Sequence, residues 1–350
     1  MKKRRVIQSI KAKMKKYRYL LSQPNTYHIS KRKLLKAYWY GFTPEEYVVY
    51  DLDRNSPKDY LSEYERYSFR EQIQRKRTVV DNKITCYCLL RKFITVNTIY
   101  AYKLRGDSAC TWLEQTKDID GLLRELENAA KLVYKRISCG GGEGFKLLEY
   151  DDGRYFINRE PCERADLERL LLETDDYLIE QYCVQSDFEN ELFPYAVNTV
   201  RLITAVHKDG TVEPLWAVQR IGIDAEKCVD NACAGGLSAE IDMNTGVMSV
   251  ARSRATTRIG QVYEMHPATG VRIEGVAIPN WQSIVQKMVQ LHSKLRFTAL
   301  NYIAWDIALT NNGIAIIEAN ASCGMRILQT FGGQRNSKVG LWMKEWGYIK

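Results

Sequence analysis

The chain has 350 residues, of which 45% are hydrophobic and 27% charged. This composition is ordinary for a folded globular protein and leaves room for two or three domains. It contains no apolar run of about 18 residues, so we expect no transmembrane helix, and no secretory signal peptide is expected behind its basic start. The nine cysteines are scattered without CxxC pairs, which favours a reducing cytoplasm over a disulfide framework.

The net charge of +9 is concentrated at the N-terminus. Residues 1–18 contain nine Lys or Arg and no acidic residue, whereas the rest of the chain has 42 basic and 42 acidic residues. We therefore do not expect the body of the protein to bind nucleic acid. The N-terminal apolar residues recur at helical spacing, which predicts a basic amphipathic helix that can lie on an anionic membrane surface. A solvated tail and a helix docked on its own domain are the alternatives. The apolar residues are Val6, Ile7, Ile10 and Met14.

The remaining pattern predicts an α+β protein. Residues 1–75 are expected to form a helical, basic accessory segment, and residues 81–96 a helix that leads into a strand. A helix is expected at 120–130 and another at the sequence WQSIVQKMVQLHSKL. Strands and helices mix without regular alternation, which favours α+β lobes over a doubly wound sheet. The strands expected between the two helices are 132–137, 145–150, 177–184 and several beyond residue 195.

A glycine-rich loop follows the strand that contains Lys135. Glycines allow backbone N–H groups to approach phosphate oxygens closely, and a neighbouring lysine adds a point charge. The order of strand, lysine, loop and strand predicts a hairpin whose tip folds over a nucleotide; a flexible surface hairpin is the alternative. A Walker P-loop is excluded, because GxxxxGK[ST] is missing and no helix follows. The glycines are Gly140, Gly141, Gly142 and Gly144.

Two arginines lie within apolar strands. Arg201 lies in AVNTVRLITAV on the same face as Thr199, and Arg220 lies in LWAVQRIG. An arginine in such a run needs an anionic partner, which is either a structural carboxylate or a phosphate. The loop DNACAGG that follows requires special backbone angles and contains Asn231, which can contact phosphate or substrate. The sequence lacks HxxxH and HExxH, which argues against a zinc hydrolase.

The segment 301–324 contains two apolar β-rich runs around Asn-Asn-Gly, which predicts a hairpin. If residues 311–313 form its loop, Asp306 faces Glu318, and Asn320 lies two residues further along the same face. Like charges opposed in this way are destabilising, unless a hard cation such as Mg²⁺ lies between them. A two-residue loop would shift the register by one and place the two carboxylates on opposite faces.

Taken in order, these motifs resemble the ATP-grasp proteins, and among them the sugar-transfer-associated group found with polysaccharide-building functions. The resemblance rests on Lys135 with CGGGEG, on IEQYC, on NTVRLIT, on DNACAGG and on Asp306 with IIEANAS. It implies two α+β lobes that grip ATP. The expected domains are the accessory segment 1–75, an N-terminal lobe at 76–185 and a C-terminal lobe at 186–350.

The resemblance also implies roles for individual residues. Arg201 and Arg220 would stabilise phosphate or an acyl phosphate, and Asn231 would complete the catalytic set. The family's Rossmann-like first domain is replaced here by the basic helical segment, which leaves the acceptor site undefined. The implied metal ligands are Asp306, Glu318 and Asn320. The implied nucleotide-binding residues are Lys83, Lys135, Gly140, Gly141, Gly142, Gly144, Glu180, Gln181 and Cys183.

The implied activity is that of an ATP- and Mg²⁺-dependent ligase. A carboxylate would attack the γ-phosphate of ATP, and an amine would then displace phosphate to leave an amide, as in amidation of a uronic acid or attachment of an amino acid to a sugar. A phosphotransferase with a hydroxyl acceptor and a nucleotide-binding scaffold of a glycan-assembly complex are the alternatives, because both would use the same ATP site. The expected partners are glycan or small-molecule carboxylates and amines, with membrane contact through residues 1–18 at the inner face. The oligomeric state stays open.

Overall fold

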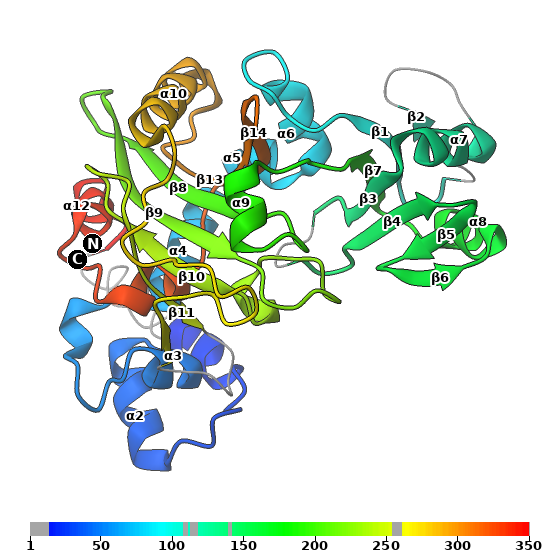
Figure 1. Ribbon diagram of the computed structural model, residues 1–350. Helices are drawn as coiled ribbons and strands as arrows, with labels where there is room; N and C mark the ends of the chain where they lie inside the picture. Colours follow the sequence, from blue (N-terminus) through cyan, green and yellow to red (C-terminus); the bar gives the residue numbers. More distant parts are fainter. Residues whose placement is uncertain (1–13, 108–110, 113–117, 139–141, 254–260, 350) are drawn as a thin grey trace.

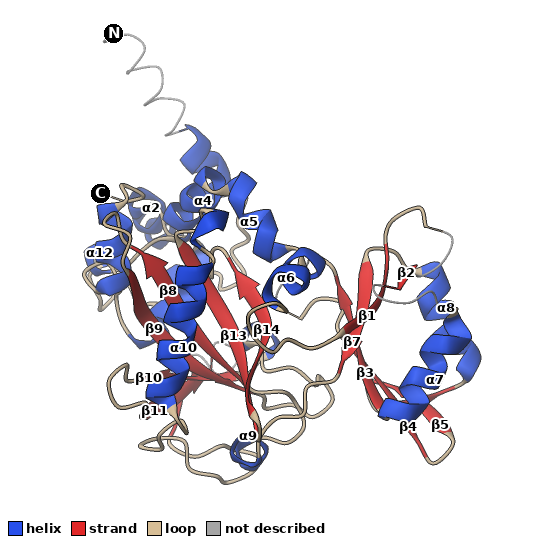
Figure 2. Cartoon of the chain, turned by 90° about the horizontal axis from the view of Figure 1, so that it is seen from above, coloured by secondary structure: helices blue, strands red, loops and turns tan. Residues whose placement is uncertain are grey.

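The computed structural model describes residues 14–107, 111–112, 118–138, 142–253 and 261–349. Two seven-stranded sheets form two lobes, and helices cover parts of both sheets (Figures 1 and 2). Neighbouring strands within each sheet run antiparallel wherever the described residues pair as a ladder. The predicted α+β fold is therefore confirmed.

The N-terminal part is helical, as predicted, over its described residues. Residues 14–21 form a helix, and the three helices that follow are each capped by a Ser or Thr hydroxyl that accepts a backbone N–H. The capping boxes at Thr43 and Ser62 explain where two of them begin. Residues 1–13 of the predicted basic amphipathic helix at 1–18 lie outside the described residues. The three helices are α2 (Lys31–Tyr40), α3 (Pro44–Val49) and α4 (Glu63–Gln72), with a short turn η1 (Pro57–Asp59).

The helices α5 (Gln74–Asp81) and α6 (Lys83–Leu90) follow. Their buried side chains, Val80, Cys86 and Leu90, join the hydrophobic core of the second sheet, although the first sheet comes next in the chain. The strand expected at the end of 81–96 is wrong: only an isolated bridge forms there, and the first strand begins at Ile99. This segment bonds to both sheets, through Thr95 O and Thr98 O, so it does not pair along one strand as a ladder.

The first sheet has the order β2-β1-β7-β3-β4-β5-β6. The helices α7 (Ile119–Ala129) and α8 (Arg164–Glu173) cover one of its faces (Figure 2). Their leucines pack on Leu132 and Tyr177 in a separate small core. The strands are β1 (Ile99–Lys103), β2 (Thr111–Trp112), β3 (Lys131–Arg136), β4 (Lys146–Asp151), β5 (Arg154–Ile157), β6 (Glu160–Cys162) and β7 (Tyr177–Gln181).

The second sheet has the order β12-β11-β10-β9-β8-β13-β14. Helix α10 (Trp281–Lys294) covers the face that contains Trp305, since His292 of this helix stacks edge-on against that ring. The opposite face is covered at one end by aromatic side chains of α4 and α12 (Lys338–Glu345). The strands are β8 (Thr199–Val206), β9 (Val212–Ile221), β10 (Leu237–Ile241), β11 (Met248–Ser253), β12 (Val262–Tyr263), β13 (Tyr302–Thr310) and β14 (Gly313–Asn320).

The hairpin of β13 and β14 differs from its prediction in one respect. Thr310 pairs with Gly313, so the loop has two residues and not three. A two-residue loop alone would have separated the carboxylates, but the register shifts between Asp306 and Ile307. Ile317 is the extra residue of this β-bulge, and Asp306 therefore still faces Glu318. The predicted loop length is wrong, whereas the predicted pairing is confirmed.

The chain passes between the lobes at residues 91–98 and again at 182–186. The first connection bonds to both sheets: Thr95 O accepts from Ile316 N at 3.0 Å, and Thr98 O accepts from Gln181 N at 2.8 Å. The predicted domain divisions after residues 75 and 185 stay predictions. Helices within the described residues all fall short of the length and apolar character needed to cross a membrane. The remaining short elements are α9 (Asp187–Leu192), η2 (Ala232–Ala234), η4 (Arg296–Thr298), α11 (Met325–Leu328) and η5 (Gln329–Phe331).

Candidate active site

A cavity of about 290 Å³ lies between the two lobes. Strands β3 and β7 and the loop after β3 line it on one side, and strands β8, β9, β13 and β14 line it on the other. Loops at 228–232 and 322–327 complete its wall. A cavity of this kind, bounded by two lobes and lined by converging polar groups, is the usual setting of a ligand site.

The polar lining on the side of the second sheet comes from a single face of that sheet. Thr199 pairs with Arg220, and Arg201 pairs with Asp306, which in turn pairs with Glu318. Residues paired directly across strands lie on the same face. Alternation along these strands therefore turns four charged side chains and their neighbours toward one cavity.

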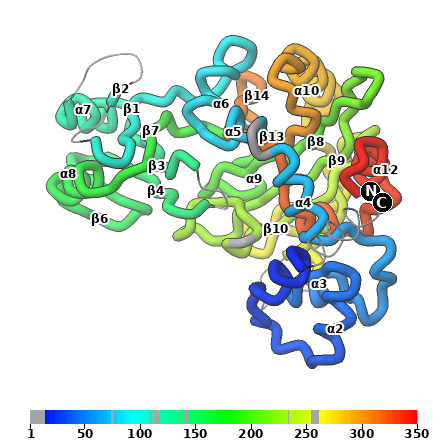
Figure 3. Tube along the Cα trace, turned by 180° about the vertical axis from the view of Figure 1, so that it is seen from behind, coloured from blue at the N-terminus to red at the C-terminus, as the bar shows by residue number. Residues whose placement is uncertain are grey.

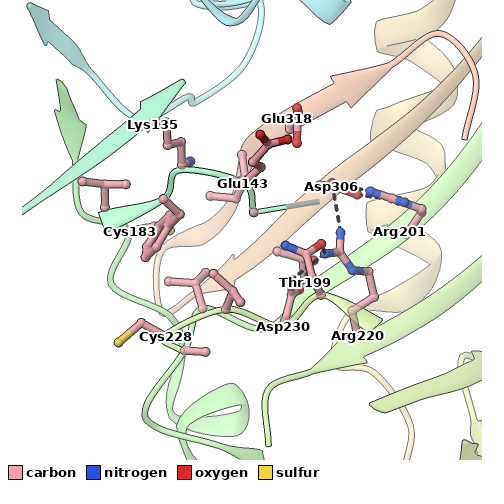
Figure 4. A pocket seen from close by; sticks show the side chains of 18 of the residues that line it. Lys135, Glu143, Cys183, Thr199, Arg201, Arg220, Cys228, Asp230, Asp306 and Glu318 are labelled. Carbon is pink, nitrogen blue, oxygen red and sulfur yellow. Dashed lines mark hydrogen bonds and ion pairs between the residues drawn. The ribbon is translucent and has the colours of Figure 1, made fainter. Parts of the chain in front are cut away.

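Asp306 is held by two arginines at the centre of this face. Arg201 donates from Nε to Oδ1 at 2.7 Å and from its terminal nitrogen to Oδ2 at 2.6 Å, and Arg220 donates to Oδ2 at 3.0 Å. Figure 4 shows both guanidinium groups pointing toward this carboxylate from different strands. Burial alone would raise the pKa of Asp306, but the two guanidinium groups outweigh burial and hold this pKa below its usual value.

Arg220 also connects the sheet to the loop that begins at Asp230. It donates to Asp230 Oδ1 at 2.6 Å and to Asn231 Oδ1, while Thr199 donates its hydroxyl to the other oxygen of Asp230. A Cβ on Gly236 would lie 2.3 Å from the carbonyl oxygen of Asp230. Gly235 in the same loop has a φ of 103°, so the special backbone angles predicted there are confirmed, and the loop places Asn231 on the cavity wall.

Two lysines add to the positive lining. Lys83, at the start of α6, forms an ion pair of 3.2 Å with Glu318, and Lys135 of β3 pairs with Glu180 of β7. Burial alone would lower the pKa of Lys135, but the carboxylate of Glu180 outweighs it and raises this pKa. Lys83, Lys135, Arg201 and Arg220 are therefore each paired with a carboxylate.

The candidate metal ligands converge on the cavity with different partners. Asp306 accepts hydrogen bonds from arginines, and Glu318 forms an ion pair with one lysine. The amide nitrogen of Asn320 is buried without a hydrogen-bond partner in the described part of the chain. Rotation of the side-chain amide by half a turn exchanges its nitrogen and oxygen, so Asn320 can turn either atom toward a ligand. The described residues contain no group of three or more His, Cys, Asp or Glu arranged to hold a metal ion. Two carboxylates with one amide oxygen are nevertheless a donor set that Mg²⁺ accepts.

The glycine loop lies over the cavity between β3 and β4. Gly142 and Gly144 adopt positive φ angles of 78° and 71°, a region that residues with a side chain rarely enter. A Cβ on Gly142 would approach Asn231 Nδ2 to 2.8 Å, so glycine is also needed there for space. The predicted glycines Gly140 and Gly141 lie outside the described residues.

The end of the cavity near β7 is more apolar. Val133, Leu147 and Ile317 line it together with Glu180 and the buried Cys183. Burial raises the pKa of the Cys183 thiol to about 11. The cavity thus has an apolar end beside the edge of a strand and a charged end on the second sheet, which suits a ligand with a flat ring and an anionic tail.

Most residues expected from the sequence meet in this one cavity. Gln181 does not line it, because Glu180 and Gln181 alternate along β7 and only the first points inward; Gly144 is also outside the lining. Asp230 and Glu143 line the cavity but were not expected. The need of Arg220 for an acidic partner was the signal that could have identified Asp230. The expected residues that line the cavity are Lys83, Lys135, Gly142, Glu180, Cys183, Arg201, Arg220, Asn231, Asp306, Glu318 and Asn320.

Known proteins provide an independent comparison. The model of the sugar-transfer associated ATP-grasp family matches residues 62–338, which confirms the resemblance found in the sequence. No curated protein matches the chain.

Several solved structures are similar to this chain. The D-alanine–D-alanine ligase from Bacillus anthracis is 12% identical, with 77% of this chain and 62% of that chain covered and a TM-score of 0.37. The ATP-grasp ligase PsnB, complexed with a minimal precursor, Mg and ADP, is 14% identical, with 78% and 60% covered and a TM-score of 0.39. The L-amino acid ligase from Bacillus licheniformis is 11% identical, with 73% and 44% covered and a TM-score of 0.38. The chain thus spans 44–62% of the length of these proteins.

Proposed function

The chain belongs to the sugar-transfer associated ATP-grasp family, and we propose that it is an ATP- and Mg²⁺-dependent ligase that joins a carboxylate to an amine. ATP-grasp enzymes generally use ATP and Mg²⁺. We further propose that the reaction passes through an acyl phosphate and belongs to the cytoplasmic synthesis of a cell-surface polysaccharide. A uronic acid that is amidated, or an amino acid that is attached to a sugar, would fit this chemistry.

The observation that carries the proposal is the set of cations around one cavity. Lys83, Lys135, Arg201 and Arg220 all line it, and they come from both lobes. Four positive groups that converge from two sides match the charge of a polyphosphate, and they act more strongly in a cavity from which water is excluded. In the described structure each of these four cations forms an ion pair with a carboxylate, which holds the cation in position before a ligand binds.

The apolar end of the cavity is suited to bind a nucleobase. Val133 and Leu147 belong to the first sheet and Ile317 to the second, so a flat ring between them would contact both lobes. The backbone and side-chain groups at 180–183 would provide hydrogen bonds at its edge. Lys135, beneath the glycine loop, would then lie near the phosphates.

Asp306, Glu318 and Asn320 would hold Mg²⁺. Bound there, the ion would supply neutralisation of the phosphate charge. Glu318 and Asn320 are the members best able to bind, because Asp306 already accepts three hydrogen bonds from arginines. Lys83 would have to release Glu318, which an incoming phosphate would favour by offering the lysine a new partner.

Transfer from phosphate to acceptor needs no covalent bond to the protein. The thiols that line the cavity are poor nucleophiles, since burial raises the pKa of Cys183 to about 11 and raises the pKa values of Cys228 and Cys323. Arg201 and Arg220 lie on the sheet face next to the candidate metal ligands, where they would stabilise charge on a phosphate that is being transferred. These groups would hold the reactants in position and neutralise the charge of the phosphate, which is what direct phosphoryl and acyl transfer requires.

Product analysis tests the proposal. The protein would be incubated with Mg-ATP, uronic-acid sugars and a pool of amino acids and amines, and the products identified by mass spectrometry. Phosphate release that requires both a carboxylate and an amine, together with an amide product, is the expected result. A stable phosphoester would show a phosphotransferase instead. ATP binding without turnover across these substrates would contradict the proposed ligase.

A further inference from the structure

We propose that the N-terminal helices form a surface that docks on an anionic phospholipid bilayer. The surface comprises the exposed apolar and basic side chains of the helix 14–21 and of α2. Of the fifteen large apolar side chains that are exposed among the described residues, six lie within residues 14–40, so they are concentrated there. The proposal is independent of the reaction proposed above. The six are Met14, Tyr17, Leu21, Leu35, Trp39 and Tyr40.

Helix α2 carries the central part of this docking surface. Leu35 and Trp39 are four residues apart and therefore share one face of the helix, where they are 71% and 73% exposed. Lys31, Arg32 and Lys36 lie three or four residues from one or the other and flank them. The opposite side of the helix, at Ala37, is buried against α3 and the neighbouring loop. The apolar pair is therefore not an unused part of the core but a stripe turned to solvent between basic residues.

The helix 14–21 repeats this arrangement. Met14, Tyr17 and Leu21 are exposed at spacings of three and four residues, and Arg18 lies among them. The other side of this helix is attached to the body, since Leu20 is buried and Tyr19 stacks on Tyr67 at 4.8 Å.

The two helices are held next to each other. Lys16 Nζ donates to the backbone carbonyl of Trp39 at 2.9 Å, which joins the helix 14–21 to the last turn of α2. In Figures 1 and 3, α2 lies at the outer edge of the molecule, beyond α3 and away from both sheets. No described part of the chain covers the exposed stripe of α2.

The charge around this surface has one sign. Residues 1–44 contain thirteen Lys or Arg and no Asp or Glu. Lys33 pairs with Asp53 at 2.6 Å, but Arg18, Lys31 and Arg32 form no ion pair with any described residue. These cations are therefore available to an external anion, and basic residues close to a bilayer surface are attracted by anionic lipid headgroups.

The combination of groups selects a bilayer over other anionic partners. Trp and Tyr side chains prefer the boundary between headgroups and acyl chains, and leucines insert below it. Nucleic acid would match the charge, but it offers no apolar layer for Leu35 and Trp39. An amphipathic helix with an apolar stripe between basic residues is the form that lies in the plane of a membrane interface.

The same helical segment contacts the cavity. Glu45, in the first turn of α3, pairs with Arg326, which lines the cavity between the lobes. Docking through α2 would therefore join one wall of the cavity to a membrane-bound segment, which suits a substrate attached to a lipid. This consequence depends on the proposed function, whereas docking itself does not.

Vesicle binding of the full chain tests the proposal. Sedimentation is measured with vesicles of phosphatidylcholine alone and with vesicles that also contain about 30% phosphatidylglycerol. The expected result is binding to the mixed vesicles alone, which decreases as salt is added. The variant Arg32→Gln/Trp39→Gln removes one charge and one apolar anchor, and we expect it to reduce the partition coefficient by about tenfold or more. Both side chains are exposed, so its thermal unfolding should match that of the wild type.

A matched control removes the same kinds of group elsewhere. Lys294→Gln/Phe297→Gln changes an exposed lysine and an exposed aromatic side chain next to α10, and it should leave vesicle binding unchanged. The proposal is overturned if the wild type does not sediment with the mixed vesicles, or if the Arg32→Gln/Trp39→Gln variant sediments equally well. It is also overturned if the lipid-free chain is a dimer that this variant dissociates, because a second copy would then occupy the surface.

Discussion

Asp306 and Glu318 face each other across β13 and β14, yet they are held in different ways. Asp306 is 3% exposed and accepts three hydrogen bonds from two arginines, whereas Glu318 is partly exposed and pairs with Lys83 at 3.2 Å. The first carboxylate is fixed in the structure of the sheet, and the second is free to exchange its partner. The two positions should therefore respond differently to loss of charge.

Glu318→Gln should greatly weaken turnover while leaving the fold intact. The amide cannot replace the charge of a metal-binding carboxylate, so we expect Mg-ATP turnover to fall by about a hundredfold or more. Because the side chain is partly exposed, its change should alter the free energy of unfolding by less than about 1 kcal/mol. Steady-state phosphate release and urea unfolding measure the two effects. Turnover near the wild-type level would show that the metal assignment is wrong.

Asp306→Asn should instead destabilise the protein. The substitution leaves Arg201 and Arg220 in a buried site with less negative charge, and breaking a buried pair of this kind costs about 3–5 kcal/mol. Urea unfolding measures the loss. The double variant Asp306→Asn/Arg201→Gln is the control, since it removes a charge of each sign and should recover part of the stability. Equal stability of the wild type and Asp306→Asn would contradict this account.

Lys135→Met should weaken nucleotide binding. The lysine would give a charge-assisted hydrogen bond to phosphate, which is worth about 1.5–3 kcal/mol, and we therefore expect ATP affinity to fall by about tenfold to a hundredfold. The change also leaves Glu180 buried without its cation. The control Lys135→Met/Glu180→Gln restores neutrality, and it should recover thermal stability but not affinity. Calorimetric titration with ATP separates these results; affinity unchanged in both variants would place the phosphates elsewhere.

The residues that share a face could be predicted because alternation along a strand is a local property. Alternation predicts that Thr199 and Arg201 share a face, and the structure confirms that both side chains line the cavity. The agreement at Asp306 and Glu318 has a different origin. The predicted three-residue loop was wrong, and the bulge at Ile317 compensated for it. A bulge changes register without a marked change of residue type, so the sequence carries little signal for it.

Features that depend on distant contacts could not be predicted. The helix α6 is amphipathic only weakly and gives no indication that it packs on the sheet that follows later in the chain. The sequence leaves the partner of Arg220 open between a carboxylate and a phosphate, and the structure shows Asp306 and Asp230 in that place. Strands β5 and β6 lie outside the predicted elements because runs of 4 and 3 residues are too short to show a clear period.

Gly142→Ala should impair the glycine loop more than an equivalent change elsewhere. The residue has φ of 78°, and a Cβ would lie 2.8 Å from Asn231 Nδ2. We expect ATP affinity to fall because both the loop and Asn231 must shift. Gly153→Ala is the matched control: its φ is 77°, but a Cβ there would meet nothing within 4 Å. Both variants carry a backbone penalty of about 1–2 kcal/mol, so a larger loss of affinity in Gly142→Ala isolates the contact with Asn231. Equal affinities would contradict this role.

Glu189 should make stability depend on pH. Burial raises the pKa of this side chain from its ordinary value of 4.5 to about 8, although Gln219 donates a hydrogen bond to it at 2.9 Å. The folded state therefore binds more protons than the unfolded state between these pH values, and the free energy of unfolding should decrease as the pH rises from 4.5 toward 8. Each pKa unit corresponds to about 1.4 kcal/mol.

The variant Glu189→Gln serves as the comparison, because it cannot ionise. Urea unfolding at several pH values should show the wild type losing stability relative to this variant as the pH rises. Parallel curves for the two proteins would mean that Glu189 has an ordinary pKa in the folded state.

The segment 91–98 contacts both sheets through backbone hydrogen bonds, and the second connection at 182–186 is only a few residues long. Two short connections on one side of the molecule keep the lobes from sliding apart. We expect the main remaining motion to be a rotation about the line between these two connections, which would widen the opposite edge of the cavity. The glycine loop and the arginine face would then approach and separate with one degree of freedom, so a ligand that bridges them would shift the balance between open and closed forms by its own affinity.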